Sequence, residues 1–189
     1  MTFSPKSIGL VRLISQARYR SQQFFAAISP TVSEADRSLV REVFADNAAA
    51  IQVFERMTPG DQQHAIAVLR SLLERKQDAP ALQQAALLHD VGKALGQPIL
   101  YRCIIVLLKM LSPSTLRWLG QAPLDSPAWR KPFVVHRQHP SIGATWAKEA
   151  GCPALAVTLI EIHQDTPPKN PVTTLDLLHA ALYQADGEH

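Results

Sequence analysis

The sequence Leu87-Leu88-His89-Asp90-Val91-Gly92-Lys93 places a histidine and an aspartate side by side at the end of an apolar run. The run begins at Ala85 and is typical of a buried helix, so two side chains that can bind metal follow a segment expected in the core. A simpler interpretation of the dipeptide alone is a helix end at which Asp90 accepts backbone hydrogen bonds. The other histidines of the chain favour the first interpretation.

His64 lies on a helix that the sequence predicts from Thr58 and Pro59, which supply an N-cap and a first-turn proline. His64, Val68 and Leu72 follow one another at helical spacing, so we expect His64 to face the core. A hydrogen-bonded core histidine would show the same pattern. The pattern alone therefore leaves open whether His64 binds a metal.

The rest of the sequence has the pattern of helices separated by proline and glycine. Asp78-Ala79-Pro80 is expected to begin the helix that leads to His89, and Pro140 is expected in the first turn of a helix that runs to Ala150. The chain has no strand-like alternation, hairpin dipeptide or repeat of fixed period. We therefore predict an all-α fold, in which residues 1–57 form an N-terminal helical extension that packs on a domain of residues 58–189. The other expected helices cover residues 5–28, 33–44, 47–57, 99–111, 153–163 and 172–185.

The order of these histidines and aspartates resembles that of the HD-domain metal-dependent phosphohydrolases, an all-helical superfamily with the pattern H…HD…H…H…D. His64 resembles the first histidine, and His89-Asp90 the central pair. His139, in His139-Pro140-Ser141-Ile142-Gly143-Ala144, resembles the HPxxGA histidine of two-metal members, where His163 and Asp186 match the last two positions. The His-His-Glu…GYP signature of the cyclic-di-GMP branch is absent, so that branch's substrate is not implied.

The resemblance implies a helical bundle with a pair of divalent metal ions. The first ion would be held by His64, His89, Asp90 and Asp186, and Asp90 would bridge to a second ion held also by His139 and His163. Imidazole and carboxylate ligands favour Mn, Fe, Co, Ni or Zn, whereas ligands that are all oxygen favour Mg or Ca.

Four further residues near these motifs have predicted roles. Asp90 and Lys93 are the expected catalytic residues, with Lys93 placed to contact a phosphate oxygen. His136 is the rival of His139 and is expected to lie outside the ligand set. His179 is expected to be a core group or a neighbour of the ligands.

Composition and charge limit the partners of the chain. The 189 residues are 47% hydrophobic, enough for a substantial core. A net charge of +3 permits a phosphorylated small molecule or nucleotide as substrate but does not by itself indicate nucleic-acid binding. Cys103 and Cys152 lie in apolar surroundings without a CxxC motif, and no signal peptide is evident, so a reducing, cytoplasmic location is expected.

Three segments have more than one interpretation. Residues 5–28 suit an amphipathic helix that packs on the domain, on a second subunit in a homo-oligomer or on a membrane surface. Residues 99–111 are apolar nearly all round and fit either a core helix or a surface that needs a partner. Residues 94–138 combine tryptophan with Arg117, Arg130 and Lys131, and are expected to form either a lid over the substrate or a packing subdomain.

Metal-dependent phosphohydrolysis is the function that the resemblance implies. The presence of all the landmarks favours an enzyme, because a scaffold alone would not need so many ionisable groups that face inward. One alternative is a non-catalytic HD module that serves in binding or signalling. Another is a peripheral membrane or partner-docking protein, suggested by residues 5–28 and 99–119.

Overall fold

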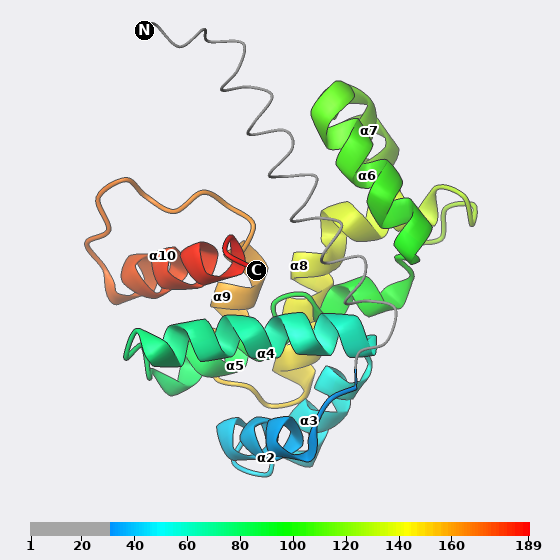
Figure 1. Cartoon of the computed structure of the whole chain (residues 1–189). Coiled ribbons are helices and arrows are strands. Elements are labelled where there is room, and N and C mark those ends of the chain that lie inside the picture. The colour runs from blue at the N-terminus through cyan, green and yellow to red at the C-terminus, as the bar shows by residue number, and fades with distance from the viewer. Residues whose placement is uncertain (1–30) are drawn as a thin grey trace, which may run out of the picture.

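The computed structural model describes residues 31–189, so the predicted helix of residues 5–28 lies outside the described residues. The described part of the chain is all-helical, as predicted, and contains no strand. Figure 1 shows its helices packed around one another. The helices are α2 (Glu34–Val43), α3 (Ala48–Glu55), α4 (Pro59–Glu74), α5 (Pro80–Leu88), α6 (Ile99–Leu111), α7 (Pro113–Gly120), α8 (Lys131–Glu149), α9 (Ala154–Ile162) and α10 (Thr174–Asp186), with a 3-10 turn, η1 (Val91–Leu95), after α5.

Helix α5 lies at the centre of the fold and contacts α2, α3, α4, α9 and α10. Its last four residues, 85–88, are fully buried, as expected of the apolar run before His89. Apolar side chains of α2 and α3, such as Val40 and Phe54, belong to the same buried cluster as those of α4 and α5. The His89-Asp90 pair therefore follows directly on a fully buried turn of helix.

Local signals in the sequence set several helix ends. The Ser33 side chain accepts a hydrogen bond from the backbone of Asp36, whose carboxylate accepts one from the Ser33 backbone, so the two residues form a capping box at the start of α2. Thr58 caps α4 with Pro59 in the first turn, and Gly151 follows α8 with a positive φ of 79°. Asp78 does not cap α5, because Ala79 occupies the cap position.

Helix α8 differs from the prediction. We expected a helix to begin beside His139, with Pro140 in its first turn. In the structure α8 begins at Lys131, so Pro140 lies inside the helix. An interior proline removes one backbone hydrogen bond and leaves a carbonyl without its usual donor. Here the carbonyl is that of His136, and it accepts a hydrogen bond from the His139 ring instead.

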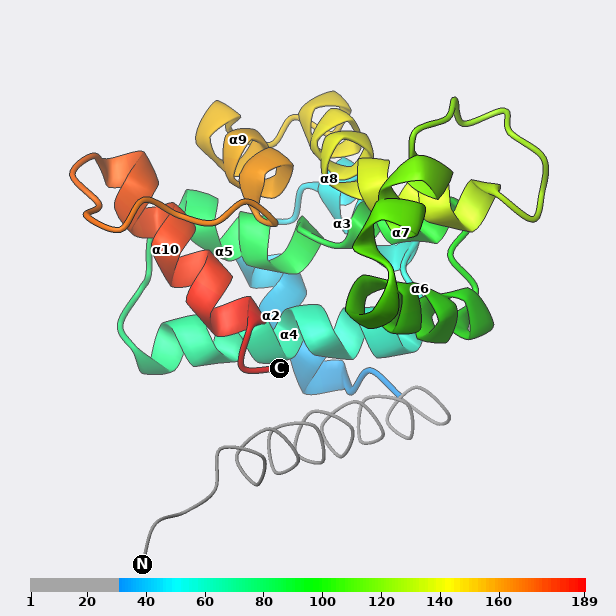
Figure 2. The same ribbon diagram turned by 90° about the horizontal axis from the view of Figure 1, so that it is seen from above.

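Helices α6 and α7 lie together at one end of the molecule, away from α10 (Figures 1 and 2). They contact each other and α8. Leu119 of α7 and Phe133 of α8 form a small buried cluster with Ile105, separate from the main core. Among residues 100–111 of α6, whose burial the structure describes, only Ile105 is buried.

Within residues 31–189, no single helix has both the length and the apolar composition needed to cross a bilayer. The pair Pro80–Leu95 and Leu100–Leu111 meets the criterion only when its two halves are counted together across a bend of 103°. The first half of this pair is the buried α5 with η1.

Candidate metal centre

The structure brings the six side chains predicted as metal ligands to one place in the bundle. Each comes from a different helix or helix end, and together they form two groups. The inner group is defined as Asp90, His139 and His163. The outer group is defined as His64, His89 and Asp186, and Asp90 also lies within ligand distance of its two histidines.

Three histidine rings are oriented in the same way. The Nδ1–H of His89 donates to the carbonyl of Ala86 at 2.9 Å, that of His139 to His136 at 2.8 Å, and that of His163 to Ile160 at 2.7 Å. A carbonyl can only accept, so each Nδ1 carries the proton in a neutral ring. The Nε2 atom of each ring is then left with a lone pair that can bind a metal.

Each accepting carbonyl is free because the helix ladder does not use it. The carbonyls of Ala86 and Ile160 lie in the last turns of α5 and α9, which end just before His89 and His163. The carbonyl of His136 would receive the backbone N–H of residue 140, but Pro140 has none. The histidine three residues after each carbonyl supplies the missing donor. We call this arrangement the carbonyl clamp.

The Nε2 atoms of His89, His139 and His163 are buried without a hydrogen-bond partner. They face carboxylate oxygens: His89 Nε2 lies 3.3 Å from Asp186 Oδ1, and His139 and His163 Nε2 lie 3.3 and 3.7 Å from Asp90 Oδ1. Two lone pairs directed at each other repel, so each pair needs a cation between them, either a proton or a metal ion.

Asp90 connects the two groups through its two carboxylate oxygens. Oδ1 faces His139 and His163, whereas Oδ2 lies 3.6 Å from His89 Nε2. Nitrogen and oxygen ligands of first-row ions lie about 2.0–2.2 Å from the metal, which places two ligands of one ion roughly 3 to 3.5 Å apart. The separations across both groups, 2.9 to 3.7 Å, fit such an ion in each.

The outer group is more open than the inner group. The side chains of His64 and Asp186 are 21% and 35% exposed, and His64 Nε2 lies 2.9 Å from Asp186 Oδ1. The side chains of His139 and His163 are 0% and 1% exposed. Solvent or a substrate therefore reaches the centre from the side of His64 and Asp186.

The pKa values differ between the groups. Burial lowers the pKa of His89, but the charge of Asp90 and the contact with Asp186 outweigh it and raise this pKa to about 9. Burial lowers the pKa of His139 to about 4, despite its contact with Asp90. Burial raises the pKa of Asp186, but its contacts with His64 and His89 hold it well below the ordinary value. His139 is therefore neutral at physiological pH, as a metal ligand must be.

Lys93 donates to Asp90 Oδ2, on the side of the outer group. The predicted phosphate contact of Lys93 therefore requires its ammonium group to leave this carboxylate. The ammonium balances part of the charge of Asp90, whose pKa is held well below its usual range. Burial opposes this shift, and the charge of Lys93 is the largest cause that favours it.

Two glycines allow the site to close. A Cβ at Gly92 would lie 2.2 Å from the carbonyl oxygen of His139, so only glycine permits η1 to approach α8 this closely. A Cβ at Gly143 would lie 3.2 Å from Val91 and 3.3 Å from Ile160. Because neither glycine has a side chain, the three segments that carry the inner group can pack closely against one another.

The remaining histidines of the described chain lie outside both groups. His136 stacks on His139 with ring centroids 6.1 Å apart, and burial together with the nearby His139 lowers its pKa to about 4. His179 is buried with its ring edge against Tyr183, and its Nε2 has no hydrogen-bond partner. His189 does not belong to either group.

Arg102 has a structural role that the sequence did not predict. Arg102 forms a two-pronged ion pair with Asp61, with Nη2 2.8 Å from Oδ2, and its Nε donates to the Gln97 carbonyl at 3.0 Å. Burial lowers its pKa, but Asp61 and the charge of Asp90 raise it above the usual value. Arg102 thus ties α6 to α4 and adds positive potential near the centre. No spacing or motif in the sequence pairs it with Asp61.

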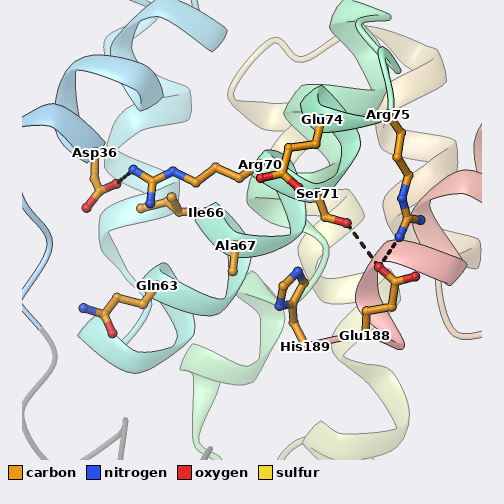
Figure 3. A pocket seen from close by; sticks show the side chains of 10 residues that line it. All are labelled: Asp36, Gln63, Ile66, Ala67, Arg70, Ser71, Glu74, Arg75, Glu188 and His189. Carbon is orange, nitrogen blue, oxygen red and sulfur yellow. Dashed lines mark hydrogen bonds and ion pairs between the residues drawn. The ribbon is translucent and has the colours of Figure 1, made fainter.

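A surface hollow of about 550 Å³ lies elsewhere, between α2, α4 and the C-terminus (Figure 3). Its arginines are already paired: Arg70 with Asp36 at 2.6 Å, and Arg75 with Glu188. None of the six predicted metal ligands lines it. The hollow is therefore separate from the candidate centre.

Comparisons of the chain with family models, curated proteins and solved structures found no match.

Proposed function

We propose that this chain is a metal-dependent phosphohydrolase with two divalent transition-metal ions. The observation that carries the proposal is the set of buried Nε2 atoms that face carboxylate oxygens while each Nδ1 is bonded to a carbonyl. A protein that needed only a packed core would not bury so many polar groups around one point. The motif order that resembles HD-domain phosphohydrolases supports the same function.

His139, His163 and Asp90 would hold one ion, and His64, His89, Asp186 and Asp90 the other. When bound, such a pair of ions supplies an activated water for attack on phosphorus and positive charge against the phosphoryl oxygens. Asp90 positions both ions, because one of its oxygens faces each group. The partly exposed side at His64 and Asp186 admits the substrate.

Lys93 provides the remaining positive group of the site. Its ammonium donates to Asp90 Oδ2. Once Asp90 served as a metal ligand, Lys93 would be free to orient a phosphate oxygen of the substrate. The proposed substrate class is a phosphorylated small molecule or nucleotide, in keeping with the net charge of +3.

The Lys93–Asp90 contact also favours a second candidate, a non-catalytic HD-like scaffold. In that case Lys93 and a proton on His89 take the place of metal, in line with the raised pKa of His89. Such a module would serve in binding or signalling.

Metal analysis separates the two candidates. The full chain is purified without chelator, its content of Mn, Fe, Co, Ni and Zn is measured by plasma mass spectrometry, and the same sample is tested against phosphomonoesters, nucleotides and phosphodiesters. We expect close to two ions per chain and hydrolysis of at least one class. His139→Gln should lower both the metal content and the rate of hydrolysis, whereas the matched control His136→Gln should change neither quantity. A chain that binds none of these metals after reconstitution and hydrolyses nothing is the scaffold.

A further inference from the structure

Helix α6 presents a continuous apolar surface to solvent. Leu100, Leu107 and Leu111 are 66%, 59% and 76% exposed, and Ile104 is 38% exposed. These positions follow at intervals of three and four residues, so their side chains lie along one face of the helix. We define the α6 stripe as Leu100, Cys103, Ile104, Leu107, Met110 and Leu111, all of which are exposed.

The α6 stripe is not part of the core of the described chain. Helix α6 packs through its opposite side, where Ile105 joins Leu119 and Phe133. A shallow hollow on the helix is lined only by apolar residues and cysteine, among them Leu107 and Leu111. A contiguous exposed surface of this kind marks a contact site.

The charge around the stripe indicates the kind of partner. Residues 91–124 contain no aspartate or glutamate but four basic residues. Lys93 and Arg102 are paired with Asp90 and Asp61, so Lys109 and Arg117 supply the positive charge of the α6 end. Residues 1–30 have the same character in sequence, with four basic residues and no acidic one. The remaining sequence holds 11 basic and 16 acidic residues, so positive charge is concentrated in these two stretches. An anionic partner complements the α6 end of the molecule.

Two exposed tryptophans accompany the stripe. Trp118 on α7 and Trp129 in the following loop are 60% and 54% exposed. Arg130 stacks over Trp118 at 4.8 Å and donates to the carbonyls of Trp118 and Leu119. Tryptophan beside basic side chains is typical of segments that lie at the interface between water and lipid.

We propose that the α6 stripe lies on the surface of an anionic phospholipid membrane. The helix would lie in the plane of the interface, with its apolar side chains among the acyl chains near the headgroups and Lys109 and Arg117 attracting acidic lipid. A second copy of the chain fits the stripe less well, because pairing would bring together two basic surfaces without acidic residues.

Cys103 offers a probe on the stripe itself. It is exposed, whereas Cys152 is buried and burial raises the pKa of its thiol, so a thiol-reactive, environment-sensitive dye labels Cys103 preferentially. The labelled full chain is mixed with vesicles of phosphatidylglycerol and phosphatidylcholine, or of phosphatidylcholine alone. We expect a blue shift of the dye emission and co-sedimentation with the mixed vesicles only, both reversed by salt.

Variants test which surface makes the contact. Leu107→Glu with Leu111→Glu should weaken vesicle binding by about tenfold or more, because two apolar side chains no longer enter the lipid. Val172→Glu with Leu177→Glu is the matched control, since these residues are 83% and 55% exposed and lie outside α6. The control should bind as the parent does.

Three results would overturn the proposal. The first is vesicle binding without a change in the emission of the dye on Cys103, which would assign the contact to residues 1–30 alone. The second is a blue shift that grows with protein concentration in the absence of lipid, which would assign the stripe to a second copy of the chain. The third is absence of binding to mixed vesicles by folded parent protein.

Discussion

The inner and outer groups of the candidate centre use the same ligand types in different surroundings. The inner histidines are fully buried, and a carbonyl clamp fixes each ring. In the outer group, His89 has the same clamp, but His64 and Asp186 are partly exposed and bond directly to each other. The comparison shows that the same ligand types lie in a closed, buried setting in the inner group and in a partly exposed one in the outer group, so under the proposed function the inner group would retain an ion and the outer group would meet the substrate.

Asp90 is the side chain that both groups share, so its replacement should have the largest effect. Asp90→Asn keeps the shape but loses the charge, and we expect loss of both ions, metal affinity at least about a hundredfold lower and hydrolysis at background level. Metal content and activity after reconstitution are the measurements. Retention of one ion in Asp90→Asn would show that the groups are independent.

A single replacement in either group should remove the ion of that group and leave the other ion in place. His139→Gln should remove the inner ion, whereas His64→Gln should leave it in place and lower occupancy of the outer position only. Anomalous scattering from crystals of each variant locates the remaining ion. Equal loss of both ions in the two variants would contradict a division into inner and outer positions.

Removal of metal should destabilise the fold. Ions present at a thousandfold above their dissociation constant stabilise the native state by about 4 kcal/mol each. Each such contribution corresponds to a shift in Tm of roughly 8 to 16 °C for a domain of this size. Thermal unfolding of chelated and reconstituted samples measures this shift in Tm. The shift should be smaller in His139→Gln, because that variant lacks the inner ion. A Tm that chelator does not change would argue for the metal-free scaffold.

Pro140→Ala should have the smallest and most specific effect. The new N–H of residue 140 would compete with the His139 ring for the His136 carbonyl, so affinity for the inner ion should fall by about tenfold. The same change should raise the Tm of the metal-free chain, because an interior proline costs a helix up to about 3 kcal/mol.

Pro132→Ala, in the first turn of α8, is the matched control for this prediction and should leave metal affinity unchanged. A metal titration followed by thermal unfolding of both variants gives the two quantities. A rise in Tm with unchanged affinity would mean that the clamp on His139 does not matter.

The sequence predicted the helical fold, because helical spacing is a local feature. It pointed to the six side chains that the structure brings together only through an order of histidines and aspartates that resembles that of a known family. It did not predict the start of α8. A proline beside a histidine was interpreted as a first-turn proline, since the sequence does not show that the histidine ring replaces the missing donor. Arg102 was missed for a related reason, because its partner Asp61 lies 41 residues away. Lys93 was identified, but its contact with Asp90 depends on a side-chain conformation that spacing does not fix.

The contact between His64 and Asp186 joins residues 122 positions apart. It closes most of the described chain into one loop, and closing a loop of this length costs considerable chain entropy. An ion held by both side chains would act as a reversible cross-link between the start and the end of the bundle. The affinity of the outer position for metal would then also set how often α10 detaches from α4, and a protease that cuts near the C-terminus would report that equilibrium directly.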